Sequence, residues 1–291
     1  MQLLGIDHVS AITAARAECL DFYAGLLGLK PCGCPPAEGS RGDLCFGDGR
    51  EGSAVLRFVD SPGAPTGSPG PGMVHSVRWW VPGRRALEQW AARLEIGGIA
   101  AELGFDQVGD PVAVRFSDPE GLSHELIPRP VTDRPRRSEG RPVAGMPPGL
   151  KLAGVRAFVA GSVQSFDLLA GRLGFSAAGA GEWQVGSARY ACDPPPSSRP
   201  FQGAGTVHHV AWRCAPGEER AWRQRVIGMG ATVSRICEED GIRWFFFREP
   251  DGVLFSVASA GRTAAAPASL PARPRQLPPR IARPVGLRAA A

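Results

Sequence analysis

A repeated unit of one strand, one helix and three short strands constrains the fold of this chain more than any other feature. Two copies match closely: residues 72–77, GMVHSV, align with residues 205–210, GTVHHV, and residues 118–125, DPEGLSHE, align with residues 249–256, EPDGVLFS. The same frame places weaker copies at the start of the chain and after residue 150. A single unit of this kind cannot bury its own apolar face, so the copies are expected to pack against one another.

Each copy shows the periodicities of its expected elements. Alternating apolar and polar residues predict opening strands at 3–12, 73–80, 152–159 and around 207. Amphipathic helices are predicted to follow at about 17–28, 84–94, 163–173 and 218–227. Short strands joined by turns close each copy. The predicted fold class is therefore α+β, built from four βαβββ modules.

Composition divides the four modules into two pairs. Residues 129–150 are rich in proline, arginine and glycine, which is typical of a linker. We therefore expect an N-terminal domain of two modules at 1–128 and a C-terminal domain of two modules at 151–260. Residues 261–291 form a tail rich in proline, alanine and arginine, for which we expect a solvated or loosely docked extension. The sequence leaves open how the modules pair in space.

The overall composition is that of a globular protein. Apolar residues make up 43% of the 291 residues and charged residues 21%, and no apolar run is long enough to cross a membrane. The N-terminus has no basic segment ahead of an apolar one, so no secretion signal is expected. The seven cysteines lack the spacing of a zinc knuckle, and we expect them to be reduced thiols in a cytoplasmic protein.

The net charge of +5 does not indicate a nucleic-acid partner. The tail after residue 261 holds six arginines and no acidic residue, so the rest of the chain carries a net charge of −1. A nucleic-acid interface would place its positive charge on one face of a folded domain. We therefore expect no nucleic-acid and no membrane partner, and the sequence leaves open whether the chain forms a homo-oligomer.

Two adjacent histidines are the strongest functional signal. His208 and His209 lie on a predicted strand, where successive side chains point to opposite faces. One ring is therefore expected to line a cavity while the other points away from it. The same alternation predicts that Asp7 points away from His8 near the start of the chain.

These modules and motifs resemble the vicinal oxygen chelate superfamily, which includes glyoxalases, bleomycin-resistance proteins and extradiol dioxygenases. Residues 5–12, GIDHVSAI, residues 206–211, TVHHVA, and residues 247–255, FREPDGVLF, look most like ring-cleaving dioxygenases of the hydroquinone type. The resemblance covers about residues 1–260. It implies two vicinal-oxygen-chelate domains and an active site shared by the first and last modules.

The resemblance also implies a metal site. In that family two histidines and one glutamate hold Fe(II) or Mn(II) and leave other positions of the ion open for substrate and oxygen. By position, His8 and His209 are the implied metal ligands here, and Ser256 stands where the carboxylate is usual. His208 is the candidate catalytic acid or base, because its ordinary pKa near 6.5 suits proton transfer. The alternative for His208 is a hydrogen-bonded, buried residue.

Other positions around the implied site also depart from the family pattern. Asp7 replaces a usual histidine, Glu239 an arginine and Phe246 a tyrosine. Glu239 is one candidate for a replacement carboxylate, reaching inward from a loop. His75 and His124 are expected to be structural.

The second module retains a carboxylate at the equivalent position. Glu125 aligns with Ser256, but Ser76 and Ala157 stand where that site would need its histidines. We therefore expect Glu125 to form an ion pair with Arg156 or Arg189 rather than to bind a metal.

The resemblance leaves two hypotheses for the function. In the first, the chain is a ring-cleaving dioxygenase-like protein that acts on a dihydroxy-aromatic substrate of hydroquinone or catechol type with Fe(II) or Mn(II), although the site lacks its usual carboxylate. In the second, it is a metal-free or catalytically inactive member of the superfamily that binds or sequesters an aromatic small molecule. One face of residues 244–247, WFFF, offers an apolar wall for such a ligand. The missing carboxylate also leaves a coordination position for an exogenous anion.

Overall fold

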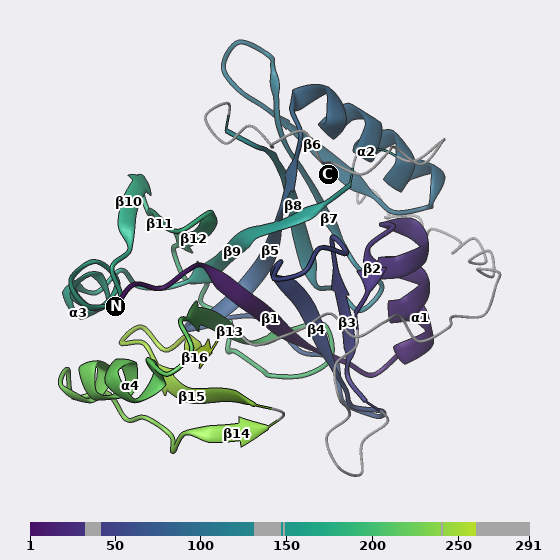
Figure 1. Ribbon diagram of the computed structural model, residues 1–291. Coiled ribbons are helices and arrows are strands. Elements are labelled where there is room, and N and C mark those ends of the chain that lie inside the picture. The colour runs from purple at the N-terminus through teal and green to yellow at the C-terminus, as the bar shows by residue number, and fades with distance from the viewer. Residues whose placement is uncertain (33–41, 131–146, 148, 240, 260–291) are drawn as a thin grey trace, which may run out of the picture.

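The computed structural model describes residues 1–32, 42–130, 147, 149–239 and 241–259 (Figure 1). Its strands form two eight-stranded sheets, and short helices pack beside them. Within these residues, no helix is long and apolar enough to cross a membrane.

All four modules have the predicted order of strand, helix and three strands. The first contains β1 (Ile6–Thr13), α1 (Arg16–Leu20), the π-helix η1 (Asp21–Leu26), β2 (Lys30–Pro31), β3 (Leu44–Gly47) and β4 (Val55–Asp60). The second contains β5 (Met73–Val81), α2 (Arg84–Ile96), β6 (Ala101–Phe105), β7 (Pro111–Ser117) and β8 (Ser123–Pro128). The third contains β9 (Lys151–Phe158), α3 (Val163–Phe166), the π-helix η2 (Asp167–Arg172), β10 (Ser176–Gly179), β11 (Glu182–Val185) and β12 (Ala188–Asp193). The fourth contains β13 (Val207–Cys214), α4 (Glu219–Ile227), β14 (Cys237–Glu239), β15 (Ile242–Arg248) and β16 (Leu254–Ser259).

The sheets combine modules from opposite halves of the chain. One sheet has the strand order β14-β15-β16-β13-β1-β4-β3-β2, which joins the fourth module to the first. The other has the order β10-β11-β12-β9-β5-β8-β7-β6, which joins the third module to the second. In each sheet the two modules meet through antiparallel opening strands, β1 with β13 and β5 with β9. The boundaries at 128 and 151 therefore divide the repeats along the chain but not the sheets.

The apolar core is continuous across the modules. One cluster of buried side chains includes Phe22, Trp79, Phe175 and Trp212, one from each module. The Trp212 and Phe175 rings meet edge to face, with centroids 4.8 Å apart. Burial of each large apolar side chain contributes about 1.5–3 kcal/mol, so contacts of this kind stabilise the two sheets as one body.

Two acidic turns connect the modules in a second way. Glu120, in the β7–β8 turn, accepts a hydrogen bond from the backbone N–H of Ala14 at 2.8 Å, just before α1. Asp251, in the β15–β16 turn, accepts one from the backbone N–H of Gly161 at 2.9 Å, just before α3. The turns thus link the second module to the first and the fourth to the third, whereas the sheets link the first to the fourth and the second to the third.

Glycine is required where these turns pack against the opening strands. Gly72 and Gly205 precede β5 and β13 with φ of 75° and 78°, which side chains rarely adopt. A Cβ on Gly205 would lie 2.2 Å from the carbonyl oxygen of Glu120, and one on Gly72 would lie 3.0 Å from that of Asp251. The two glycines that aligned in the sequence therefore meet equivalent turns.

The first predicted helix is shorter and wider than its periodicity indicated. After α1 the chain forms a π-helical turn, with the Leu27 N–H bonded to the Phe22 carbonyl and the Leu29 N–H to the Tyr23 carbonyl. This wider turn buries the consecutive residues Phe22 and Tyr23 completely. A regular α-helix would direct two successive side chains about 100° apart.

The cysteines differ in part from expectation. Five are free thiols in the described residues, whereas Cys45 is disulfide-bonded, so the prediction of reduced thiols is wrong for Cys45. Burial raises the thiol pKa of Cys192 and of Cys214 to about 12. Thiols of this kind are poor nucleophiles at neutral pH.

Candidate functional site

A β-bulge near the start of β1 places Asp7 beside His8. Ile6 pairs with Trp212 of β13, and His8 pairs with the preceding residue, Ala211, so Asp7 is the extra residue. A bulge interrupts the alternation of side chains and re-aims them. Oδ2 of Asp7 lies 2.9 Å from Nδ1 of His8. The expectation that Asp7 points away from His8 is therefore wrong.

A second bulge on β13 brings the two adjacent histidines together. His209 pairs with Ser10 and Val207 pairs with Ala11, so His208 is the extra residue. The Nδ1 atoms of His208 and His209 are 2.9 Å apart, and the two rings are nearly perpendicular. The prediction that these rings lie on opposite faces is therefore wrong. His209 is buried, whereas His208 is exposed.

The pairing of the first and fourth modules brings His8 and His209 into contact. Their Nε2 atoms lie 3.1 Å apart, and their rings meet at 83°. Two imidazole nitrogens that bind one octahedral ion at about 2.1 Å and at right angles would be about 3.0 Å apart. The spacing therefore suits two ligands of a common ion as well as a direct hydrogen bond. Metal binding by this pair stays a prediction.

Four side chains form a continuous hydrogen-bonded row. One assignment of tautomers satisfies every contact: His208 Nδ1–H donates to His209 Nδ1, and His209 Nε2–H donates to His8 Nε2. His8 Nδ1–H then donates to Oδ2 of Asp7. The Nε–H of Arg213 donates to the other carboxylate oxygen of Asp7 at 3.1 Å. The row thus ends at a carboxylate that is paired with a guanidinium.

The environment keeps two of these histidines uncharged at neutral pH. Burial lowers the pKa of His209 well below its ordinary value, and the neighbouring His8, His208 and Arg57 lower it further. Burial also lowers the pKa of His208, with a smaller effect from the charge of Arg248. A neutral imidazole is the form that binds a metal ion or accepts a proton.

The position of the usual carboxylate lies on the same face of the sheet. Ser256 pairs with Ala211 of β13 on one side and with Phe246 of β15 on the other, and Ala211 pairs with His8. Paired residues on neighbouring strands share a face. Ser256 is buried, with 1% of its surface exposed. The structure therefore places a neutral hydroxyl in the row of the imidazoles.

The aromatic strand β15 contributes one ring to this face. Phe246 meets His209 edge to face, with ring centroids 5.0 Å apart. The neighbouring Phe245 and Phe247 point into the core, where Phe247 contacts Phe255 at 5.8 Å. Phe246 is therefore the part of the expected apolar wall that borders the histidines.

Sequence reasoning missed Arg57 of β4. Arg57 pairs with Ser10, which pairs with His209, so all three lie in one row on the same face. Its Nε donates to Oδ2 of Asp43 at 2.5 Å. Because β4 lies against β1 as β16 lies against β13, Arg57 is the counterpart of Ser256 in the first module. The alignment of modules one and four, extended to β4, is the signal that could have identified it.

The donor set fits two protein ligands of an Fe(II) or Mn(II) site but not three. Among the described residues, no group of three or more His, Cys, Asp or Glu side chains is placed to hold one metal ion. Such ions favour a set that includes carboxylate oxygen, and Ser256 cannot supply one. Glu239, considered as a replacement, lies in edge strand β14 rather than in a loop, and its side chain is outside the described residues.

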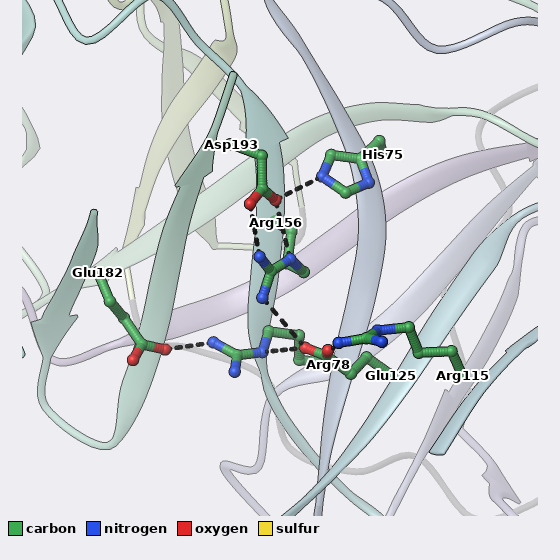
Figure 2. A network of polar contacts seen from close by, with 7 residues as sticks. All are labelled: His75, Arg78, Arg115, Glu125, Arg156, Glu182 and Asp193. Carbon is green, nitrogen blue, oxygen red and sulfur yellow. Dashed lines mark hydrogen bonds and ion pairs between the residues drawn. The ribbon is translucent and has the colours of Figure 1, made fainter. Parts of the chain in front are cut away.

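The second sheet retains a carboxylate, and arginines surround it (Figure 2). Glu125 is 3% exposed and lies within ion-pair distance of Arg78 at 2.8 Å, Arg115 at 3.1 Å and Arg156 at 3.4 Å. The expected ion pair with Arg156 is confirmed. Three guanidiniums neutralise this buried anion, so it is held as a structural group rather than free to bind a cation.

The network continues from Glu125 toward the edge of that sheet (Figure 2). Arg156 pairs with Asp193 at 2.5 Å, and Nε2 of His75 lies 2.8 Å from the same carboxylate. Arg78 also contacts Glu182. Burial lowers the pKa of His75, so three guanidiniums balance three carboxylates in this network at neutral pH.

The remaining histidine belongs to a buried structural chain. Trp79 Nε1–H donates to Nδ1 of His124 at 3.1 Å, and Nε2 of His124 lies 2.8 Å from the hydroxyl of Tyr23. That hydroxyl donates to Oδ2 of Asp118 at 2.8 Å. Burial lowers the pKa of His124 to about 3 and raises that of Asp118 to about 6. Every polar group of the chain has a partner, which agrees with the structural role expected for His124.

Comparisons with known proteins give the same fold and one line of function. A family model described as the Glyoxalase/Bleomycin resistance protein/Dioxygenase superfamily matches residues 5–126. The chain is 29% identical over 289 residues to the "Putative ring-cleaving dioxygenase MhqA" of Bacillus subtilis, covering 90% of this chain and 88% of that protein. A crystal structure titled "putative dioxygenase", also from Bacillus subtilis, has a TM-score of 0.75 and 26% identity, covering 90% of this chain and 86% of that one. Glyoxalase I from Zea mays, with a TM-score of 0.61 and 14% identity over 88% of this chain and 92% of that one, shares the fold.

Proposed function

Because the chain belongs to the glyoxalase, bleomycin resistance protein and dioxygenase superfamily, we propose that it is a dioxygenase-like protein acting on a dihydroxy-aromatic compound. The compound is of the hydroquinone or catechol type and binds at the face that carries His8 and His209. In this proposal the two imidazoles hold Fe(II) or Mn(II) without a protein carboxylate. The similarity to ring-cleaving relatives over most of the chain supports the reaction class.

The observation that carries the proposal is the contact between the two imidazoles. Their Nε2 atoms are 3.1 Å apart although the residues are 201 positions apart in the chain. Metal-ligating histidines commonly donate their other N–H to a carboxylate, as His8 does to Asp7. When bound, the ion would polarise the oxygens of the substrate and of dioxygen.

The protein groups beside the pair have separate roles in the proposal. His208 is exposed, and the tautomer that donates from Nδ1 to His209 leaves its Nε2 as a proton acceptor. It is therefore the proposed base for a phenolic hydroxyl. Phe246, edge to face with His209, provides an apolar surface for the substrate ring.

A second candidate function is metal-free binding of an aromatic compound. The observation that favours it is the pair of equivalent positions Ser256 and Arg57, one neutral and one positive, on the same face as the imidazoles. A guanidinium opposes the binding of a cation by Coulomb repulsion. In this candidate the histidine row binds the ligand through hydrogen bonds alone.

Metal analysis separates the two candidates. The full-length chain is reconstituted anaerobically with Fe(II) or Mn(II), freed of excess metal and tested for oxygen uptake with hydroquinone and catechol. The dioxygenase proposal predicts stoichiometric metal, loss of that metal in His209→Ala, and its retention in His75→Ala, a histidine of the second sheet. Metal-free binding predicts no retained ion and a ligand-induced rise in Tm that survives a chelator.

A further inference from the structure

The charges that border the histidine row carry an inference about the ligand itself. Five charged side chains border the row directly or through one partner: Arg57, Arg213, Arg248, Asp7 and Asp43. Three are positive and two are negative, so this face holds one positive charge in excess. A carboxylate at position 256 would have balanced that excess, and the serine found there does not.

The excess is located at Arg57. Asp7 is paired with Arg213 through the 3.1 Å contact from Nε, whereas Arg248 is exposed to solvent, which screens its charge. Arg57 is 30% exposed at its side chain, and its partner Asp43 is 14% exposed. Its guanidinium is therefore only partly shielded from the face that it shares with His209.

Arg57 has donors to spare. Both Nε and Nη2 face the same oxygen of Asp43, and Nη1 has no protein partner among the described residues. A guanidinium presents five N–H donors in a planar fork that matches a carboxylate. One edge of the fork is thus occupied, and the other remains for a ligand.

The distance between this donor and the histidines suits one small ligand. Arg57 and His209 lie on strands separated by β1 alone, so their backbones are about 10 Å apart. The charge of Arg57 contributes to the low pKa of His209, which places the guanidinium within electrostatic reach of that ring. Phe246 borders the same ring on its other side.

We propose that the aromatic ligand carries a carboxylate substituent, that Arg57 binds this group through Nη1, and that this anion compensates for the charge absent at Ser256. The inference deepens the proposed function, on which it rests for the binding of a dihydroxy-aromatic ring at the histidines. It holds with or without a bound metal, because the excess charge belongs to the protein.

Binding measurements with three related compounds test it. The full-length chain is titrated calorimetrically with 2,5-dihydroxybenzoate, with its uncharged methyl ester and with hydroquinone, in the presence and absence of Mn(II). Loss of a charge-assisted hydrogen bond changes affinity by about 10- to 100-fold, and we expect the acid to bind tighter than the ester by this factor. The preference should weaken as salt is raised.

Variants assign the preference to one side chain. Arg57→Gln should bring the affinities of acid and ester together, and Arg57→Lys should restore part of the difference. Arg16 is the matched control, since it pairs with Asp60 of the same strand and has a similar exposure of 33%. Arg16→Gln should leave the preference unchanged, and circular dichroism verifies that each variant is folded.

The outcomes distinguish this inference from the proposed function. Equal binding of acid and ester by the wild type, or a preference that persists in Arg57→Gln, overturns the role of Arg57 while leaving a hydroquinone-binding site intact. If none of the three compounds binds or is consumed, the proposed function fails, and this inference fails with it.

Discussion

Glu125 on β8 and Ser256 on β16 occupy equivalent positions in the two sheets. Glu125 pairs in register with Arg78 of β5, and Ser256 pairs with Ala211 of β13. The first sheet therefore has two imidazoles without a carboxylate, and the second has a carboxylate without imidazoles. Each sheet lacks what the other retains, so the two equivalent faces have different chemistry despite one shared fold.

Restoring the carboxylate at Ser256 tests whether the first site keeps a metal geometry. Ser256→Glu should raise the affinity for Mn(II) by more than the roughly 10- to 100-fold that a partner of a metal ligand contributes. The reason is that the new side chain starts from the strand row that holds His8. Mn(II) titration followed by electron paramagnetic resonance measures the change. Ser256→Gln is the control for volume, and equal affinity of the two variants would contradict the expectation.

Removing the buried anion of the second sheet should weaken the fold. Glu125→Gln leaves three guanidiniums facing a neutral group, and the loss of one partner of a buried ion pair costs about 3–5 kcal/mol. Urea unfolding measures the free energy of unfolding. Glu182→Gln, at the 26% exposed end of the same network, should cost much less. Similar losses in both variants would show that Glu125 is not the centre of the network.

Asp118 should make the stability depend on pH. Its pKa is about 6 in the folded protein, because burial raises it from 3.8. The folded state therefore binds this proton more tightly than the unfolded chain. The resulting stabilisation is complete below about pH 4 and is lost as the pH rises through about 6.

Asp118→Asn should remove this dependence. The difference in free energy of unfolding between wild type and variant should shift by about 3 kcal/mol between pH 4 and pH 7, with the wild type gaining at low pH. Urea unfolding at several pH values provides the measurement. A difference that is constant with pH would contradict the raised pKa.

Asp7 should fix the tautomer of His8. Asp7→Ala removes the acceptor 2.9 Å from Nδ1 of that ring, so the proton should redistribute between the two ring nitrogens. Nitrogen chemical shifts of His8 report the tautomer directly, and metal affinity should fall about 10- to 100-fold. Asp7→Asn retains an acceptor and should preserve the tautomer in part. Unchanged shifts in Asp7→Ala would argue against an orienting role.

The four modules and the meeting of His8 with His209 were predictable from the sequence. The repeats carry the periodicities of their elements, and the aligned glycines Gly72 and Gly205 mark equivalent backbone positions. Two histidines in equivalent positions of different modules meet once those modules share a sheet. Local pattern and repeat alignment contain this information.

The bulges and Arg57 were not predictable in the same way. A bulge at Asp7 or at His208 is a property of the register between β1 and β13, and the alternation within one strand does not reveal it. Arg57 reaches the site because β4 lies parallel to β1, and no local signal distinguishes it from other strand arginines. Both features depend on the partner strand, which lies elsewhere in the sequence.

The joining of the first module to the fourth also sets a timetable for biosynthesis. β13 leaves the ribosome about 200 residues after β1, which is roughly 10–40 s at ordinary rates of translation. Throughout that interval the edge of β1 that will receive β13 is unpaired, and such an edge invites association with other chains. The nascent polypeptide is therefore most vulnerable to aggregation, and most dependent on chaperones, before its last module emerges.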